Sequence, residues 1–239
     1  MTGDIDPDGL TRDSGSHRLG AASALALPSL LALATYVLWS TPMVWPIKIF
    51  VVFLHELSHG LAAILTGGSI VRIELSSAEG GLCVTSGGWR FLVLSAGYLG
   101  SLTWGAFLLL VSVRTRRDRA VVGSIGLILL LVTGFWIRTL FGFVWGLSAG
   151  SALIVAAFRL PEAFSDLILK TLGVVSILYA IWDIVSDTIS RTVPGSDAHA
   201  LGELTGIPGG VWGVSWIGVS VLVVVATLRA SIRSTPDRA

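Results

Sequence analysis

Residues 51–64, VVFLHELSHGLAAI, form an apolar run that carries two histidines and one glutamate. On a helix, positions i and i+4 lie on one face, so His55 and His59 can direct their ring nitrogens at one metal ion. Glu56 is rotated by about 100° from His55, which suits a group beside an activated water better than a third ligand. The His-Glu-x-x-His pattern therefore predicts a zinc site with Glu56 as general base.

The composition predicts a membrane protein. Of the 239 residues, 53% are hydrophobic and 13% are charged, the mean hydropathy is +0.82, and soluble domains carry about 25% charged residues. The net charge of +1 argues against nucleic acid as a partner. The single cysteine, Cys83, excludes an internal disulfide and a cysteine metal cluster.

The membrane setting strengthens the interpretation of the motif. Ionisable groups inside a spanning helix are costly and mark functional sites by default, and two of the four histidines of the chain lie in this motif. The alternative is that the two histidines and the glutamate only form hydrogen bonds with a neighbouring helix.

Apolar segments divide the chain into about seven predicted spans of a hydrocarbon core about 30 Å thick. They lie near residues 21–39, 45–66, 91–113, 120–136, 140–158, 167–189 and 211–228. Residues 1–20 are polar and predict a disordered tail, and residues 231–239 form a short basic tail. We expect an all-α, multi-pass protein of the lipid bilayer, in the cell membrane, with a single transmembrane domain over residues 21–230.

A short β-hairpin is predicted directly after the second span. Residues 70–75 alternate in the period-2 pattern of a strand, and residues 82–85 form a plausible return strand after a turn-rich break. One interpretation is a strand edge that holds an extended peptide by strand addition. The other is an ordinary connecting loop, and the sequence favours neither.

A third metal ligand is expected on a later segment, because a catalytic zinc takes three protein ligands and keeps one position open. Asp183 and Asp187 lie four residues apart in the sixth apolar segment and so share a helix face. A bound dication offsets the cost of burying a carboxylate. Asp183 lies deeper and is the first choice, and Asp187 is either a partner of the ligands or the ligand itself. The polar loop that follows, with Asp197, His199 and Glu203, is a rival source.

The chain resembles the peptidase M50B-like branch of the site-2 protease metallopeptidases. The resemblance covers about residues 45–215 and rests on FLHELSHG at 53–60, TGG at 66–68, GYLG at 97–100 and the helix that carries Asp183. It implies an intramembrane protease that cleaves membrane-embedded protein substrates, in which His55, His59 and Asp183 bind Zn²⁺ and Glu56 activates water. Site-2 proteases usually present the third ligand as Asp-Gly, whereas Ile184 follows Asp183 here.

Two other classes of function fit parts of the pattern. A metal transporter would also place His and Asp near the middle of the membrane, but it predicts several ligand clusters along a path. A non-catalytic membrane scaffold with a degenerate protease site fits the altered context of the third ligand.

Charge and resemblance predict opposite orientations in the membrane. The loop from Arg114 to Arg119 is the densest basic cluster of the chain, and the positive-inside rule places it in the cytoplasm. With seven spans, the N-terminus and the hairpin then lie outside. The family resemblance instead implies a hairpin on the cytosolic side.

Overall fold

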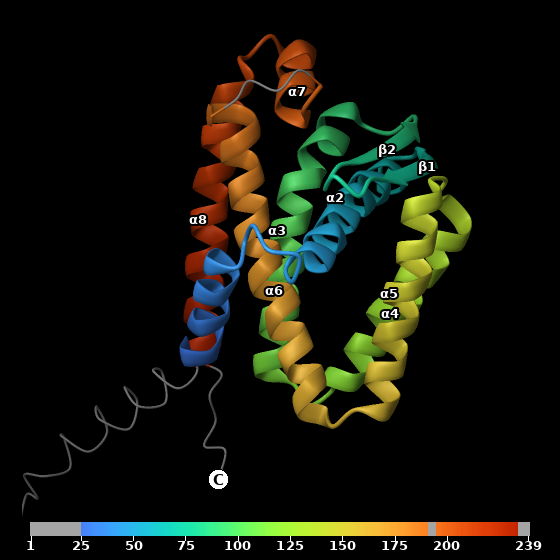
Figure 1. Cartoon of the computed structure of the whole chain (residues 1–239). Helices are drawn as coiled ribbons and strands as arrows, with labels where there is room; N and C mark the ends of the chain where they lie inside the picture. The colour runs from blue at the N-terminus through green and yellow to red at the C-terminus, as the bar shows by residue number, and fades with distance from the viewer. Residues whose placement is uncertain (1–24, 191–194, 234–239) are drawn as a thin grey trace, which may run out of the picture.

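The computed structural model describes residues 25–190 and 195–233, so the predicted tail at 1–20 and residues 234–239 lie outside the described residues. Long helices form a bundle with a small two-stranded sheet at one end (Figure 1). The labelled elements are α2 (Trp45–Leu65), β1 (Ser69–Leu75), β2 (Gly81–Ser86), α3 (Arg90–Arg114), α4 (Asp118–Trp136), α5 (Leu140–Arg159), α6 (Glu162–Val185), α7 (Asp197–Thr205) and α8 (Gly209–Arg233). The prediction of an all-α multi-pass fold with a hairpin after the second segment is confirmed.

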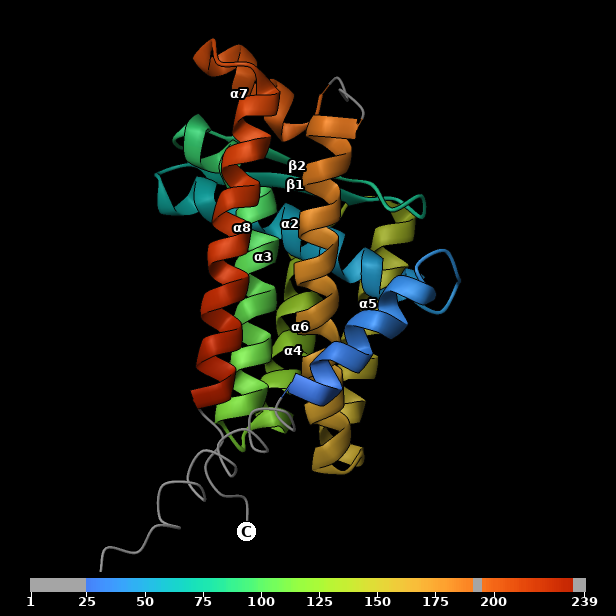
Figure 2. The ribbon, with the colours of Figure 1, turned by 90° about the vertical axis from the view of Figure 1, so that its left-hand side faces the viewer.

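Within the described residues, six helices are long and apolar enough to cross a membrane, namely α2, α3, α4, α5, α6 and α8. Of the first predicted segment, the described part is a shorter apolar helix, Leu25–Val37. This helix lies in the lower half of the molecule, and α2 starts at mid-height and rises at a slant towards the sheet (Figures 1 and 2).

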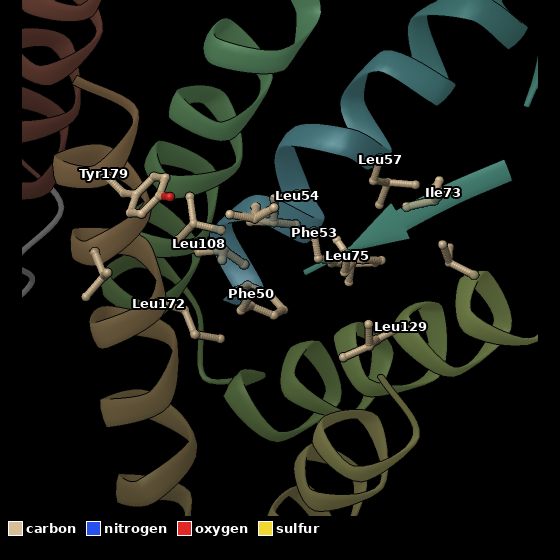
Figure 3. Packing of buried hydrophobic residues seen from close by; sticks show 14 of the residues in the cluster. Phe50, Phe53, Leu54, Leu57, Ile73, Leu75, Leu108, Leu129, Leu172 and Tyr179 are labelled. Carbon is tan, nitrogen blue, oxygen red and sulfur yellow. The ribbon is translucent and has the colours of Figure 1, made fainter. Parts of the chain in front are cut away.

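Helix α2 is the most enclosed of the six. In its most apolar window 72% of the residues are buried inside the protein, against 22–28% in α4, α5 and α8. Its apolar side chains pack against β1, α3, α4 and α6, and Figure 3 labels the main contributors, Phe50, Phe53, Leu54, Leu57, Ile73, Leu75, Leu108, Leu129, Leu172 and Tyr179. Lipid tails are as apolar as these residues, so close packing rather than water exclusion holds α2 in place.

Glycines bring two helix pairs into backbone contact. A Cβ atom on Gly105 of α3 would lie 2.8 Å from the carbonyl oxygen of Gly173 on α6, and one on Gly126 of α4 would lie 2.8 Å from the carbonyl oxygen of Gly150 on α5. Small residues of this kind let membrane helices approach closely. The α3–α6 contact sets the distance between the two helices that flank α2.

One edge of the hairpin is occupied, and the other is free of a pairing strand within the described residues. Ile73 lies opposite Cys83, and Leu75 lies opposite Gly81. On the outer side of β1, the N–H of Arg138 donates to the Ile73 carbonyl at 3.0 Å, and the Thr139 hydroxyl donates to the Leu75 carbonyl at 2.8 Å.

The pairing pattern then fixes where the backbone groups of β2 point. In an antiparallel pair, residues that face each other turn their N–H and C=O groups either both inward or both outward. Because Ile73 and Leu75 turn theirs outward, Cys83 and Gly81 do so on the other side. Within the described residues the sheet has two strands, so no strand covers this edge of β2.

The turn of the hairpin is tied to the start of α2. The indole N–H of Trp45 donates to the Ser77 carbonyl at 2.9 Å. The Lys48 ammonium, buried and 4.6 Å from the ring centre of Trp39, pairs with the Glu79 carboxylate at 3.2 Å. These contacts hold the hairpin across the bundle end.

Basic residues gather at the opposite end of the bundle, where α3, α5 and α8 finish and α4 begins (Figure 1). They are Arg114, Arg116, Arg117, Arg119, Arg159, Arg229 and Arg233. In both views the helix Leu25–Val37 also starts at this end (Figures 1 and 2). This differs from the count of seven full spans, which puts the start of the chain on the hairpin side.

We predict that the basic end faces the cytoplasm and the hairpin end faces the other side, by the positive-inside rule. Because Cys83 is the single cysteine, Cys83→Ser gives a background for single new cysteines. Ser77→Cys in the exposed turn should react with a membrane-impermeant maleimide in right-side-out vesicles, and Thr115→Cys only after the membrane is opened. The reverse labelling pattern would place the hairpin in the cytoplasm.

Candidate metal centre

Two histidines and one aspartate converge at the hairpin end of the bundle. The Nε2 atoms of His55 and His59 on α2 lie 3.0 and 3.1 Å from one carboxylate oxygen, Oδ2 of Asp197. One donor atom from each of the three residues lies within 4.8 Å of the other two. All three side chains are largely buried, with 15%, 8% and 15% exposure for His55, His59 and Asp197.

The donor set fits a zinc ion. Ligand atoms in tetrahedral directions at about 2.0–2.1 Å from zinc lie about 3.4 Å from one another, close to the separations above. The Nδ1 atom of His59 donates to the Val93 carbonyl at 2.6 Å, which leaves the Nε2 lone pair for a metal, as is usual for ligating histidines. A Cβ atom on Gly97 would lie 2.3 and 2.5 Å from the two Nε2 atoms, so only glycine admits both rings against α3.

Asp197 is presented by a short helix that the sequence analysis treated as loop. The Ser196 hydroxyl accepts from the His199 N–H and caps the start of α7, and Gly206, at φ 72°, ends it in the left-handed conformation. On its inner face, Ala198 and Leu201 pack against α3 and α8. The cap residues are local signals that could have predicted this helix.

The other sequence candidates lie close by in different roles. Asp183 lines the same cavity of about 580 Å³, but among the described residues it is not in the group that can hold a metal. The Asp187 carboxylate accepts a hydrogen bond from the Tyr98 hydroxyl at 2.9 Å. His199 faces Glu203 on the outside of α7 at 3.5 Å. The structure thus brings Asp197 of the rival segment within 3.0 and 3.1 Å of the two histidines.

Glu56 lies beside the histidines at the free edge of β2. Its side chain is buried, at 6% exposure, and lines the cavity. The backbone N–H of Cys83 donates to its carboxylate, and a Cβ atom on Gly81 would lie 2.4 Å from its Oε1 atom. Strand β2 therefore sets the position of Glu56, and the glycine leaves the space that its carboxylate fills.

The surroundings of the cavity favour a charged carboxylate at Asp197 and a neutral thiol at Cys83. Burial acts to raise the pKa of Asp197, but the adjacent rings of His59 and His55 outweigh it and hold that pKa below its usual value. Burial, with the charge of Glu56, raises the pKa of the Cys83 thiol to about 12. Cys83 is therefore protonated at neutral pH and is a poor ligand or nucleophile.

Comparison with protein families gives one match. A profile of the family described as Peptidase M50B-like matches residues 29–227, a range that includes His55, Glu56, His59 and Asp197. No curated protein and no solved structure matches the chain significantly.

We predict about one zinc per chain in the purified protein, bound by His55, His59 and Asp197. His55→Ala and Asp197→Ala should each lose the metal, and Asp183→Ala should keep it, because Asp197 is the carboxylate in the described part of the chain that bonds to both rings. Elemental analysis of the detergent-solubilised variants measures this. Zinc lost in Asp183→Ala and kept in Asp197→Ala would return the third ligand to the sixth segment.

Proposed function

We propose that this chain, which belongs to the peptidase M50B-like family, is an intramembrane zinc metalloprotease that hydrolyses peptide bonds in or near the transmembrane segments of other membrane proteins. The chain is an integral membrane protein with six apolar helices of spanning length in its described part, and we place it in the cell membrane. The observation that carries the proposal is the convergence of His55, His59 and Asp197 beside Glu56 in one cavity.

The metal that we assign to this site is zinc, in keeping with the zinc dependence that is general among M50 peptidases. His55, His59 and Asp197 would hold it, two neutral donors and one anionic donor. Bound there, zinc would polarise the substrate carbonyl and acidify the attacking water.

Glu56 is the group that we assign to proton transfer. It follows His55 directly, so its side chain leaves α2 on a different face and does not compete for the metal. Its carboxylate is held by the Cys83 N–H at the edge of the cavity. From there Glu56 takes the proton of the attacking water and delivers it to the leaving amine, as a general base and then a general acid.

The free edge of β2 is the docking site that we assign to the substrate. Carbonyls of a helical substrate are bonded within the helix, so the segment must unwind before attack. An extended peptide can pair with the outward N–H and C=O groups of Gly81 and with the C=O group of Cys83 by strand addition, while the Cys83 N–H stays with Glu56. Since the β1 edge is occupied by Arg138 and Thr139, addition is directed to the edge beside Glu56. This asymmetry favours the docking interpretation of the hairpin over that of a connecting loop.

Replacing the general base should stop cleavage and keep the metal. We expect Glu56→Gln to lower cleavage by about 10²–10⁴-fold, the usual contribution of a positioned acid–base group, with zinc content unchanged. The measurement is mass spectrometry of new peptide termini within or near spans of membrane proteins, in cells that express the wild type, the variant or an empty vector. Proteins cleaved by the wild type should co-purify uncut with Glu56→Gln.

Glu203→Gln is the matched control, because that carboxylate lies on α7 with a side chain 72% exposed. It should cleave like the wild type. Termini that appear equally with Glu56→Gln would contradict the protease and favour the membrane scaffold.

The fit between Gly81 and Glu56 gives a second test. Gly81→Ala puts a methyl group where the Glu56 carboxylate lies, so the base must move by about 1 Å, a misplacement that can lower a rate about 100-fold. Zinc content should not change. The neighbouring Gly80→Ala is the control, since the nearest atom to a Cβ there is 4.0 Å away. Equal activity of the two variants would show that β2 does not position Glu56.

A further inference from the structure

The two ligating histidines are oriented by different means. His59 is fixed by the hydrogen bond from its Nδ1 atom to the Val93 carbonyl. For His55, the hydrogen bond found among the described residues is made by Nε2 with Asp197, which is the bond that a metal would replace. Some other contact must keep the His55 ring in place when the metal is bound.

The ring of Tyr98 on α3 packs against the His55 ring. The two ring centres lie 5.0 Å apart with the planes at 85°, an edge-to-face contact. Tyr98 itself is held firmly: it is 2% exposed, its ring lies 5.1 Å from that of Trp216 on α8, and its hydroxyl donates to the Asp187 carboxylate at 2.9 Å.

Tyr98 also packs in the buried cluster that includes the inner face of α7. It belongs to a buried cluster that includes Ala198 and Leu201 of α7, the helix that begins with Asp197. One side chain thus touches the ring of His55 and shares a buried cluster with the inner face of the helix that presents Asp197. The ligands come from elements far apart in the sequence, so a shared contact sets their relative position.

The partner of the Tyr98 hydroxyl lies in an unusual piece of helix. Residues Ser186–Ser190, which follow α6, form a π-helical turn, and such turns are frequent at functional sites. This turn carries Asp187 to the Tyr98 hydroxyl. Asp187, the second carboxylate of the sixth predicted segment, thus anchors Tyr98 and need not bind the metal itself.

We propose that Tyr98, anchored by Asp187, is a positioning residue that holds His55 and α7 in the geometry of the metal centre. The inference rests on the proposed zinc site. Loss of the hydroxyl bond lets the ring of Tyr98 move, and loss of the ring lets His55 leave the orientation that faces Asp197. Outer groups that orient metal ligands typically account for 10–100-fold in affinity, by the general behaviour of such sites.

The test is the zinc affinity of the full-length protein in detergent, measured by competition with a chromophoric chelator. Tyr98→Phe and Asp187→Ala should each weaken zinc binding by about tenfold, and Tyr98→Leu by up to about 100-fold. Tyr36→Phe, at a tyrosine that is 76% exposed, is the matched control and should bind like the wild type. The double variant Tyr98→Phe with Asp187→Ala should be no weaker than either single variant, because both remove the same bond.

A second readout separates positioning from general stability. Cobalt(II) in the site reports ligand geometry through its visible absorption, and the bands should shift in Tyr98→Phe but not in Tyr36→Phe. Tyr98→Phe keeps the packed ring, so it is the variant that decides if Tyr98→Leu does not fold. Wild-type zinc affinity and an unchanged cobalt spectrum in Tyr98→Phe and Asp187→Ala would overturn the role of Tyr98 and leave the proposed zinc site standing. A wild type that binds no zinc would overturn it together with the proposed site.

Discussion

The contact between Asp197 and the two histidines of α2 is the interaction on which the rest of the structure depends. Polar groups in apolar surroundings are stable only when they are bonded to one another or to an ion. His55 and His59 lie on the most enclosed helix of the bundle, so their partner has to be brought to them. The chain does this by folding α7 back over the end of the bundle, where its inner face packs on α3 and α8.

Glycines, which have no side chain, determine the geometry of the candidate metal centre as much as the candidate ligands do. Gly97 lets both imidazoles lie against α3, and Gly81 leaves the volume that the Glu56 carboxylate fills. Gly105 and Gly173 bring α3 and α6 into backbone contact, which fixes the frame around α2. Glycines thus determine both the packing of the helices and the positions of the two histidines and Glu56.

Most of the fold and half of the centre follow from short-range patterns. Residues 51–64 carry a helical metal motif, and the alternation in residues 70–75 correctly predicts a strand. The contact between Asp197 and the histidines does not follow, because Asp197 meets His55 across 142 residues and belongs to a helix too short to show a clear period. Asp183 as third ligand stays a prediction from its depth in a span, and depth does not determine which side chains a carboxylate faces. The start of α2 at mid-height (Figure 1) likewise does not follow from counting apolar residues.

The sequence distance between the ligands has a consequence for synthesis in the membrane. Segments enter the bilayer in order from the N-terminus, so His55 and His59 are inserted long before Asp197 is made. The site stays incomplete until α6 is in place and α7 has folded back, and α7 packs partly on α8. On the proposed function, a nascent chain lacks the assembled site. A metal ion that binds only the finished arrangement would also favour that state over every partly inserted one.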